Sequence, residues 1–235
     1  MEITKKRLFR QLCCENKNLS FWIPFILIGL IATIFLVQIE KSDVIKYFSD
    51  HRTDFYDSFF AFITKLGEPI IFIIIGLLLL TRRYLDTLIL LLLSAVLSIV
   101  SFTLKSVFAH PRPRIILQDQ IGNEIIPVEG IHIFSGHTSF PSGHTLAAFA
   151  LFTYVALLIK SPIIKILSLI IAVFVGISRV YLIQHFYEDI FFGMWLGVFF
   201  GALAYLTNQY FFLKYKGNFI AGRINLTRKR GFSYK

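Results

Sequence analysis

Three short stretches of the sequence combine the residue types that bind and transfer phosphate groups, namely cations, histidines and a carboxylate. They are residues 105–113, 141–144 and 178–189. The cations among them are Lys105, Arg112 and Arg179. An arginine presents a planar fork of N–H donors that fits the oxygens of a phosphate group. We therefore expect these cations to hold a tetrahedral oxyanion if the fold brings them together.

The stretch Pro141-Ser142-Gly143-His144 precedes an apolar run, which predicts that a helix begins there. The free backbone N–H groups at the start of a helix and the positive end of its dipole both favour an anion. Gly143 lets the backbone approach a ligand closely. Ser142 and Gly143 are therefore predicted to belong to the same oxyanion site.

His185 and Asp189 are four residues apart, so a helix would place them on one face. The carboxylate could then hydrogen-bond one imidazole nitrogen and leave the other free as a nucleophile. Glu188 is an alternative partner for His185, although we favour Asp189. His144 lies at the predicted helix start, where it could donate a proton to a leaving oxygen.

The tetrad S-G-H-T occurs twice, at residues 135–138 and 142–145, and each copy contains a histidine. Only His144 follows a proline and opens a predicted helix, whereas Phe134 takes the place of the proline before the first copy. We interpret His137 as a loop residue without a catalytic role, with substrate contact as the alternative. The histidines expected to be simply solvated are His51, His110 and His132.

The composition indicates a membrane protein. The 235 residues are 56% hydrophobic, and the mean hydropathy is +0.69, which exceeds the usual apolar content of a soluble domain. A net charge of +10 could reflect nucleic acid or an anionic membrane surface. No basic module interleaved with aromatic residues lies outside the apolar runs, so we expect no nucleic-acid binding. Cys13 and Cys14 are interpreted as reduced thiols, because a vicinal pair is neither a disulfide framework nor a metal motif.

Six apolar runs are long enough, or nearly so, to cross a bilayer, which needs about 20 helical residues. They are Leu19 to Ile39, Ser58 to Leu80, Tyr84 to Leu104, Gly143 to Ile159, Pro162 to Ile183, and Ile190 to Leu213. Lys65 and Glu68 interrupt the second run, which makes it the weakest. The first run lacks a cleavage site and is interpreted as a retained anchor. The expected fold is an all-α polytopic bundle, with a basic segment 1–18, a six-span domain 19–213 and a basic tail 214–235.

The distribution of charge predicts an orientation. With the N-terminus in the cytoplasm, most of the 24 lysines and arginines fall on the cytoplasmic side, and the outer loop 40–57 carries more acids than cations. Both termini are then cytoplasmic, and the outer segments are 40–57, 105–142 and 184–189. All three phosphate-binding stretches therefore meet at the outer face, in a protein that suits a bacterial plasma (inner) membrane.

These residues resemble the three signature motifs of the type 2 phosphatidic acid phosphatase family, whose wider superfamily includes vanadium haloperoxidases. The family pattern is K, six residues, R-P; then P-S-G-H; then S-R, five residues, H, three residues, D. Every position is matched between Lys105 and Asp189. The six-span layout extends the resemblance over most of the chain.

The resemblance implies a role for each matching residue. His185 would attack phosphorus and form a phosphohistidine, Asp189 would orient it, and His144 would protonate the leaving group and then activate a water. No metal or other cofactor is implied, and three nearby cations would repel an ion from a site made of His144, His185 and Asp189. The residues expected to hold the phosphate oxygens are Lys105, Arg112, Ser142, Gly143 and Arg179.

A site at the outer face suits a lipid whose phosphate lies at the headgroup level and whose tail enters sideways between spans. The candidate substrates are undecaprenyl or other polyprenyl diphosphate, phosphatidate, phosphatidylglycerophosphate and lipid A phosphate. Arg114 and Lys65 could contact a second phosphate, although a solvent-facing position explains each as well. We expect the bilayer and its lipids as partners, and no obligate protein partner.

Three other functions share this pocket chemistry. A haloperoxidase would hold vanadate there, but such enzymes are generally soluble. A transporter or a lipid-binding scaffold would keep the pocket without turnover, which the complete set of two histidines and an aspartate disfavours. A phosphotransferase would pass the phosphohistidine to an alcohol, and the sequence leaves this alternative open.

Overall fold

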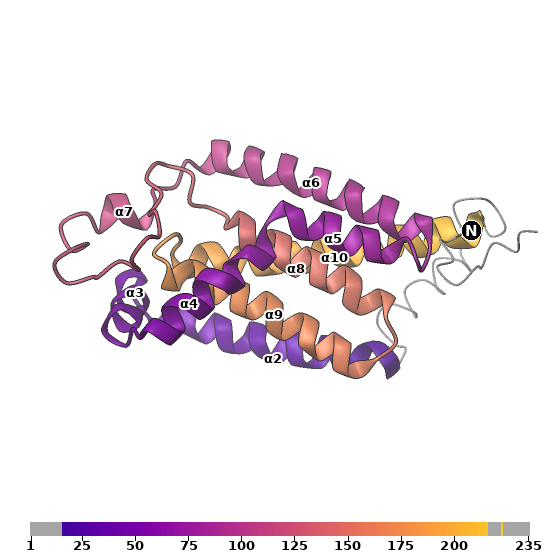
Figure 1. Cartoon of the computed structure of the whole chain (residues 1–235), viewed down its shortest axis with the longest axis horizontal. Helices are drawn as coiled ribbons and strands as arrows, with labels where there is room; N and C mark the ends of the chain where they lie inside the picture. Colours follow the sequence, from indigo (N-terminus) through magenta and orange to yellow (C-terminus); the bar gives the residue numbers. More distant parts are fainter. Residues whose placement is uncertain (1–15, 216–221, 223–235) are drawn as a thin grey trace, which may run out of the picture.

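The computed structural model describes residues 16–215 and Gly222, and the described chain is helical without a β-strand (Figure 1). Cys13, Cys14, most of the predicted basic segment 1–18 and most of the predicted tail 214–235 lie outside the described residues. The elements in chain order are α2 (Asn16–Gln38), α3 (Lys41–Asp50), α4 (Asp54–Ile63), η1 (Thr64–Gly67), α5 (Pro69–Leu79), α6 (Tyr84–Phe108), α7 (Pro113–Ile116), α8 (Gly143–Leu158), α9 (Pro162–Tyr181) and α10 (Tyr187–Lys214).

The long helices α2, α6, α9 and α10 run along the long axis of the molecule, and α8 lies among them (Figure 1). Twelve of the 16 residues of α8 are buried. A helix that is apolar on all sides is expected at the centre of a bundle, because it has no face to offer to water. The helix that begins at the predicted oxyanion site is therefore held on several sides by its neighbours.

Three glycines bring α10 unusually close to α8. Gly193, Gly197 and Gly201 recur every four residues and so lie on one face of α10. A Cβ atom at Gly197 would lie 2.7 Å from the carbonyl oxygen of Leu146, and one at Gly201 would lie 2.5 Å from that of Ala150. Small residues at this spacing allow membrane helices to pack backbone against backbone. This contact fixes the start of α8 relative to the start of α10.

The helices support a membrane protein, although six spans are not confirmed. Within the described residues, α2, α6, α9 and α10 are each long and apolar enough to cross a bilayer. The second predicted span is divided into α4 with η1 and α5, which meet at an angle of 63°. The α8 helix has 16 residues, or about 24 Å at 1.5 Å per residue, which is short for a complete crossing.

The helix break between η1 and α5 has a local cause. Glu68 has an extended backbone and Pro69 opens α5, so the ladder of helical hydrogen bonds is interrupted there. Gly67 packs against α8: a Cβ atom at this position would lie 2.9 Å from the carbonyl oxygen of His144. Non-helical backbone at membrane depth is tolerated where protein covers it. The break therefore lies against the predicted site.

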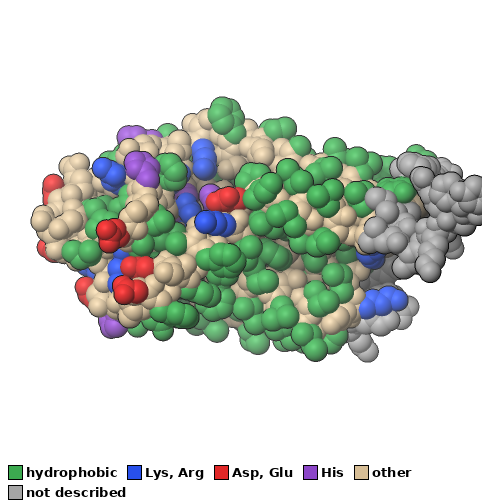
Figure 2. Space-filling model, in the orientation of Figure 1, with side chains coloured by type: hydrophobic (Ala, Val, Ile, Leu, Met, Phe, Trp, Pro, Cys, Tyr) green, Lys and Arg blue, Asp and Glu red, His purple; other side chains and the backbone are tan. Residues whose placement is uncertain are grey.

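The surface divides into an apolar band and a polar end. Figure 2 shows hydrophobic side chains over the middle of the molecule, whereas acidic, basic and histidine side chains gather at the end that carries α3 and α7. Exposed aliphatic residues such as Ile73, Leu77 and Leu88 belong to the band. Exposed apolar residues are stable in contact with lipid, so this pattern supports a membrane location.

Candidate active site

The third motif folds back on itself at the end of α9. Ile183 adopts a left-handed backbone with φ 58°, a conformation that costs a β-branched residue about 1–3 kcal/mol. The turn lets the backbone N–H groups of Gln184 and His185 both donate to the carbonyl of Arg179, at 2.9 and 3.2 Å. The side chain of Ile183 is buried with Ile45 and other apolar residues at the end of the bundle that carries α3 and α7, which holds the turn in place. Arg179 and His185 are thereby brought together.

His185 and Asp189 form a buried pair. Nδ1 of His185 donates to Oδ2 of Asp189 over 3.3 Å, and the residues are 2% and 0% exposed. The backbone N–H of Phe186 donates to the same carboxylate oxygen at 3.0 Å. Glu188, the alternative partner, instead pairs with Lys41 at 2.6 Å. This geometry leaves Nε2 of His185 as the nitrogen available for chemistry.

Ser139 contacts both residues of this pair, a role that its sequence context did not predict. Its hydroxyl donates to Oδ2 of Asp189 at 2.5 Å and lies 3.4 Å from Nδ1 of His185. Ser139 is fully buried. The only signal in the sequence is its position two residues before Pro141, since a serine in a loop is otherwise unremarkable.

Burial also sets the protonation state of His185. Loss of solvent lowers the pKa of His185 to about 4, because the charged imidazolium is disfavoured away from water. The hydrogen bond that Asp189 accepts from His185 raises this pKa, whereas Arg179 and Arg112 lower it further. The imidazole is therefore neutral near pH 7, as a nucleophile must be.

The second motif joins α8 to the other two motifs. The Ser142 hydroxyl caps α8 by accepting from the backbone N–H of Thr145 at 3.4 Å, and the Ser142 N–H donates to the carbonyl of Asp189 at 3.1 Å. A Cβ atom on Gly143 would lie 3.7 Å from Nζ of Lys105. The start of α8 is thus in contact with the third motif on one side and the first motif on the other.

Arg112 and Arg179 are held by neutral oxygens. The Arg112 guanidinium donates to the carbonyls of Gln184 and Thr138 at 3.0 and 3.3 Å. The Arg179 guanidinium donates from Nη1 to the Thr64 hydroxyl at 2.7 Å, and its buried Nε has no partner among the described residues. Both side chains are almost buried, with exposed fractions of 7% and 5%.

The charges of this cluster are not compensated by a direct ion pair. Within residues 16–215, no carboxylate lies within ion-pair distance of Lys105, Arg112 or Arg179. All three cations, together with His185, are close enough to His144 for their charges to act on it. Buried cations without a carboxylate favour the arrival of an anion.

A groove leads from this cluster into the apolar part of the bundle. Its volume is about 360 Å³, and Lys105, Gly143 and His144 form its polar end. The remainder is lined by α5, α6 and α8, with apolar side chains that include Phe72 and Leu97 and with three serines of α6, Ser94, Ser98 and Ser101. A molecule with an anionic head and a hydrocarbon tail matches this lining.

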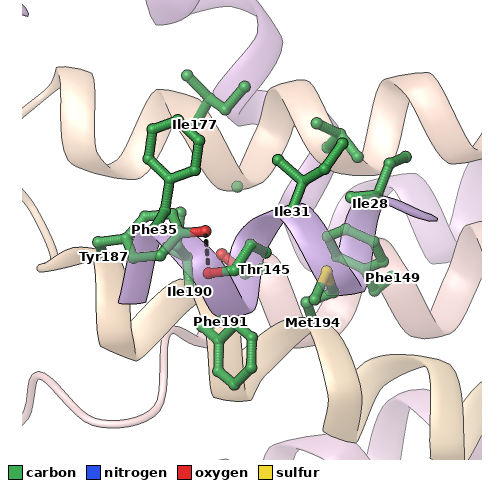
Figure 3. A pocket seen from close by; sticks show the side chains of 13 residues that line it. Ile28, Ile31, Phe35, Thr145, Phe149, Ile177, Tyr187, Ile190, Phe191 and Met194 are labelled. Atoms are coloured by element: carbon green, nitrogen blue, oxygen red, sulfur yellow. Dashed lines mark hydrogen bonds between the residues drawn. The ribbon is translucent and has the colours of Figure 1, made fainter. Parts of the chain in front are cut away.

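A second pocket lies on the other side of α8 (Figure 3). It has a volume of about 260 Å³ and is lined by α2, α8, α9 and α10. Its polar side chains are Thr145 and Tyr187, and the Tyr187 hydroxyl already donates to the carbonyl of Ala32 at 2.9 Å. None of the predicted catalytic groups lines it, so its lining suits only a hydrocarbon chain.

The residues predicted to contact other parts of the substrate lie outside the cluster of catalytic and phosphate-binding residues. Arg114 is exposed and donates to the carbonyl of Ile133 at 3.1 Å, within the segment that joins α6 to α8. Lys65 is exposed in η1, one residue after the Thr64 that Arg179 contacts. His137 is exposed on the loop and has no hydrogen bond or ion pair with another described residue.

His110 was expected to be solvated, but its imidazole faces the carboxylates of Glu188 and Asp189. Its Nδ1 lies 3.8 Å from Oδ1 of Asp189 and its Nε2 lies 3.4 Å from Oε1 of Glu188. Donor atoms of these three residues lie within 4.8 Å of one another, which is close enough to hold a metal ion. Lys41 already pairs with Glu188, so this carboxylate is not free for an ion.

Known proteins are similar to this chain in sequence and in structure. Residues 86–213 match the PAP2 superfamily. Lipid phosphate phosphatase 1 from Arabidopsis thaliana is 32% identical over 129 residues, which cover 46% of this chain and 39% of that protein. Lipid phosphate phosphatase 2 from the same plant is 36% identical over 84 residues, 30% of this chain and 29% of that protein. The chain therefore matches less than half of the length of these curated relatives.

Two solved structures share the fold. The crystal structure of Aquifex aeolicus LpxE has a TM-score of 0.59 and 25% identity, and covers 71% of this chain and 96% of its own. The PAP2-type phosphatidylglycerolphosphate phosphatase from Bacillus subtilis has a TM-score of 0.59 and 26% identity, and covers 85% of this chain and 98% of its own. The likeness to both extends over almost the whole length of the solved chains.

Proposed function

Because the chain belongs to the PAP2 superfamily, we propose that it is an integral-membrane lipid phosphatase that works through a phosphohistidine at His185. The observation that carries this proposal is the convergence of three cations without carboxylate partners on a neutral histidine. Such a site has a nucleophile and an unfilled place for an anion, which are the two requirements of phosphoryl transfer.

The first step is the attack of Nε2 of His185 on phosphorus. The bond from phosphorus to the leaving oxygen breaks, and this oxygen takes a proton from His144. Asp189 keeps Nδ1 of His185 hydrogen-bonded, so it stabilises the positive charge that develops on the imidazole. In the second step His144 removes a proton from water, which attacks phosphorus and releases inorganic phosphate and free His185.

The cations stabilise the transferring group. Lys105, Arg112 and Arg179 neutralise charge on its equatorial oxygens, and the Ser142 hydroxyl and the backbone N–H of Gly143 add donors at the start of α8. Positioning and electrostatics supply most of the rate enhancement in phosphoryl transfer. We infer that the enzyme needs no metal, because protein cations occupy the role that a metal would have.

The groove between α5, α6 and α8 supports a lipid substrate. A lipid could keep its tail among Phe72, Leu97 and their neighbours while its phosphate meets Lys105 and His144. The candidate substrates remain undecaprenyl diphosphate, phosphatidate, phosphatidylglycerophosphate and lipid A phosphate. Arg114, Lys65 and His137 are candidates for contacts with the rest of the headgroup.

We also propose that the site faces the outside of the plasma (inner) membrane, with both termini in the cytoplasm. The charge distribution of the sequence supports this orientation, since most cations then lie inside. The gathering of polar side chains at the end that carries α3 and α7 agrees with a headgroup-level site (Figure 2).

The test is phosphate release by the full chain in detergent from a panel of the four lipid classes. Wild type is compared with His185→Ala and with His137→Ala, which removes an exposed histidine of the repeated tetrad. We expect His185→Ala to lose at least about 10⁴-fold in rate, and His137→Ala to stay within about two-fold of wild type. A ³²P-labelled substrate should leave an acid-labile covalent label on the wild type.

A chelator and vanadate, added to the same assay, distinguish a metal-independent phosphatase from the alternative functions. Activity that survives a chelator and is lost with vanadate supports metal-independent chemistry at an oxyanion site. Activity that a chelator abolishes would point to the metal-binding group at His110, Glu188 and Asp189 instead. A label that forms but is released only when an alcohol is added would identify a phosphotransferase, and normal turnover by His185→Ala would refute the mechanism.

A further inference from the structure

A third pocket, distinct from the groove and from the pocket of Figure 3, lies at the end of the bundle opposite the candidate active site. We name it the basal pocket. It has a volume of about 320 Å³ and lies where α6 begins, α8 ends and α9 begins. Its lining residues are Asn18, Arg82, Arg83, Leu157, Leu158, Ile159, Lys160, Lys165, Tyr205 and Gln209.

The basal pocket carries an excess of positive charge. Four of its lining residues are cations, and none of the lining residues that the structure describes is a carboxylate. The fully buried carboxylate of Asp86 lies behind the pocket and pairs with both Arg82 and Arg83. Within residues 16–215, Asp86 is the one carboxylate that forms an ion pair with a cation of this pocket.

The cations are held in place by groups around the pocket. Nζ of Lys165, which is 1% exposed, donates to Oδ1 of Asn18 at 2.8 Å and to the carbonyl of Ala156 at 2.6 Å. Arg82 donates to the carbonyl of Leu158 at 3.0 Å. These bonds fix the positive charges at the end of α8, so that the pocket is organised before any ligand arrives.

Two further features favour an anion. Lys160 is exposed in the link between α8 and α9, and it makes no hydrogen bond or ion pair with the described residues. The 20-residue helix α9 begins beside it, and Ser161 caps this helix without a side-chain hydrogen bond. The positive end of the α9 dipole therefore adds to the charge of the pocket.

We propose that the basal pocket binds the phosphate headgroup of an anionic phospholipid from the leaflet opposite the active site. Leu157 and Leu158 form a buried apolar wall of the pocket, and the partly exposed Ile159 lies at its edge, where an acyl chain of such a lipid would lie. Basic pockets between membrane helices are suited to phospholipid headgroups. In the orientation proposed above, this leaflet is the cytoplasmic one; the binding itself does not depend on the phosphatase activity.

The bound lipid is a structural ligand and not a substrate. Among the residues that the structure describes, no histidine, cysteine or carboxylate lines the basal pocket, and this lining therefore resembles a binding site more than a catalytic one. A headgroup there would contact the ends of α6, α8 and α9 together. Because a ligand that binds only the folded state stabilises it, the lipid should raise the unfolding temperature.

The experiment measures the unfolding temperature of the full chain in neutral detergent, with increasing phosphatidylglycerol or, as a reference, phosphatidylcholine. Lys160→Gln is compared with Lys214→Gln, which removes one exposed cation from the same end of the bundle but outside the pocket. We expect Lys160→Gln to weaken the apparent affinity for phosphatidylglycerol about five-fold, which corresponds to one cation near a headgroup. Lys214→Gln and the outer-end variant Lys105→Gln should respond as wild type does.

Several results would overturn the proposal. Equal losses in Lys160→Gln and Lys214→Gln would indicate nonspecific attraction to the surface, and a loss confined to Lys105→Gln would assign the lipid to the active site. An equal rise in unfolding temperature with inorganic phosphate would identify free phosphate, and not a lipid, as the ligand. Arg82→Gln is an independent second variant, and an unchanged response in both it and Lys160→Gln would also refute the site.

Discussion

Both ends of the bundle contain a pair of arginines, buried at the end with the candidate active site (the outer end) and partly exposed at the basal end, but the pairs differ in what neutralises them. At the basal end, Arg82 and Arg83 share the carboxylate of Asp86, which also accepts from Asn208 at 2.9 Å. At the outer end, Arg112 and Arg179 contact only hydroxyls and carbonyls. The basal cluster therefore contains a direct ion pair, whereas the cations of the outer cluster have only the more distant carboxylates of Asp189 and Glu68 and leave room for an anion.

This difference indicates that the charged groups of the basal end stabilise the fold, whereas those of the outer end are suited to bind a ligand. A buried ion pair is strongly destabilised when one partner is removed, because the other charge is left alone. A cluster of like charges without a partner is already unfavourable, and such departures from local stability are expected at functional sites. Substitutions at the outer end should therefore affect activity, and substitutions at Asp86 should affect stability.

The largest expected effect compares the two copies of the S-G-H-T tetrad. His144→Ala should lower kcat by about 10²–10⁴-fold, because the leaving oxygen loses its proton donor. His137→Ala removes the same side chain from an exposed loop position and should have little effect. Steady-state kinetics with a lipid phosphate measure both variants.

The leaving group provides an internal check on this assignment. The loss in His144→Ala should shrink when the substrate is p-nitrophenyl phosphate, whose leaving group needs no proton. An equal loss with both substrates would mean that His144 has a role other than general acid.

The second prediction concerns the basal end. Asp86→Asn leaves Arg82 and Arg83 without their carboxylate and should lower the free energy of unfolding by about 3 kcal/mol. The lower end of the usual range is appropriate because Arg82 is 37% exposed at its side chain. Unfolding by SDS at fixed detergent concentration gives the value, and kcat of the folded fraction should stay near that of wild type.

A matched change at the outer end makes this prediction sharper. Arg179→Gln should abolish most activity with little loss of stability, since it relieves repulsion among the cations. If Arg179→Gln unfolded the protein as readily as Asp86→Asn, the division between the two ends would be wrong.

The third prediction addresses Ser139 as a positioning residue. Ser139→Ala removes the hydroxyl that donates to Asp189 at 2.5 Å, and should lower kcat about 10–100-fold with little change in KM. Ser139→Thr retains a hydroxyl and should recover part of the rate. Equal defects in the two variants would indicate a packing role instead.

The smallest predicted effect is the dependence of stability on pH. The pKa of His185 is about 4 in the folded protein, below the value of about 6.5 for an exposed histidine. The unfolded chain therefore takes up a proton more readily, and the stability linked to His185 is present above pH 6.5 and lost as the pH falls towards 4. Between pH 7 and pH 5 the loss should be about 2 kcal/mol.

His185→Asn should remove this part of the acid sensitivity, because asparagine does not titrate. His51→Asn is the control, since His51 is exposed. The free energy of unfolding is measured at both pH values for all three proteins. The same loss in wild type and in His185→Asn would contradict the low pKa.

Residues near one another in the sequence were the most predictable part of the site. The position of Ser142 predicted a helix start at Gly143. His185 and Asp189 are in contact as expected, but not along one face of a helix, because α10 begins at Tyr187 and His185 lies before it. Both results depend on a few neighbouring residues, because Ser142 caps α8 and the Asp189 carboxylate accepts from the backbone N–H of Phe186 at the start of α10.

Contacts between remote segments were less predictable. Ser139 lies 50 residues from the Asp189 that it contacts, and His110 reaches the same carboxylate from the end of α6. A serine or a histidine in a loop gives no indication in the sequence that it will contact a distant carboxylate. The second predicted span was recognised as weak because of Lys65 and Glu68, but its bend and its packing on His144 depend on where α8 lies.

The sequence by itself determined the residue types of the site, their spacing within each motif and the apolar segments that make this a membrane protein. Those features follow from chemistry and periodicity over a few turns of helix. The tertiary structure decided which buried arginines have a carboxylate partner, which serine reaches Asp189 and how closely α8 approaches α10. These outcomes depend on the packing of every helix against its neighbours, because a charge or a hydrogen bond is compensated only by what lies within a few ångströms of it.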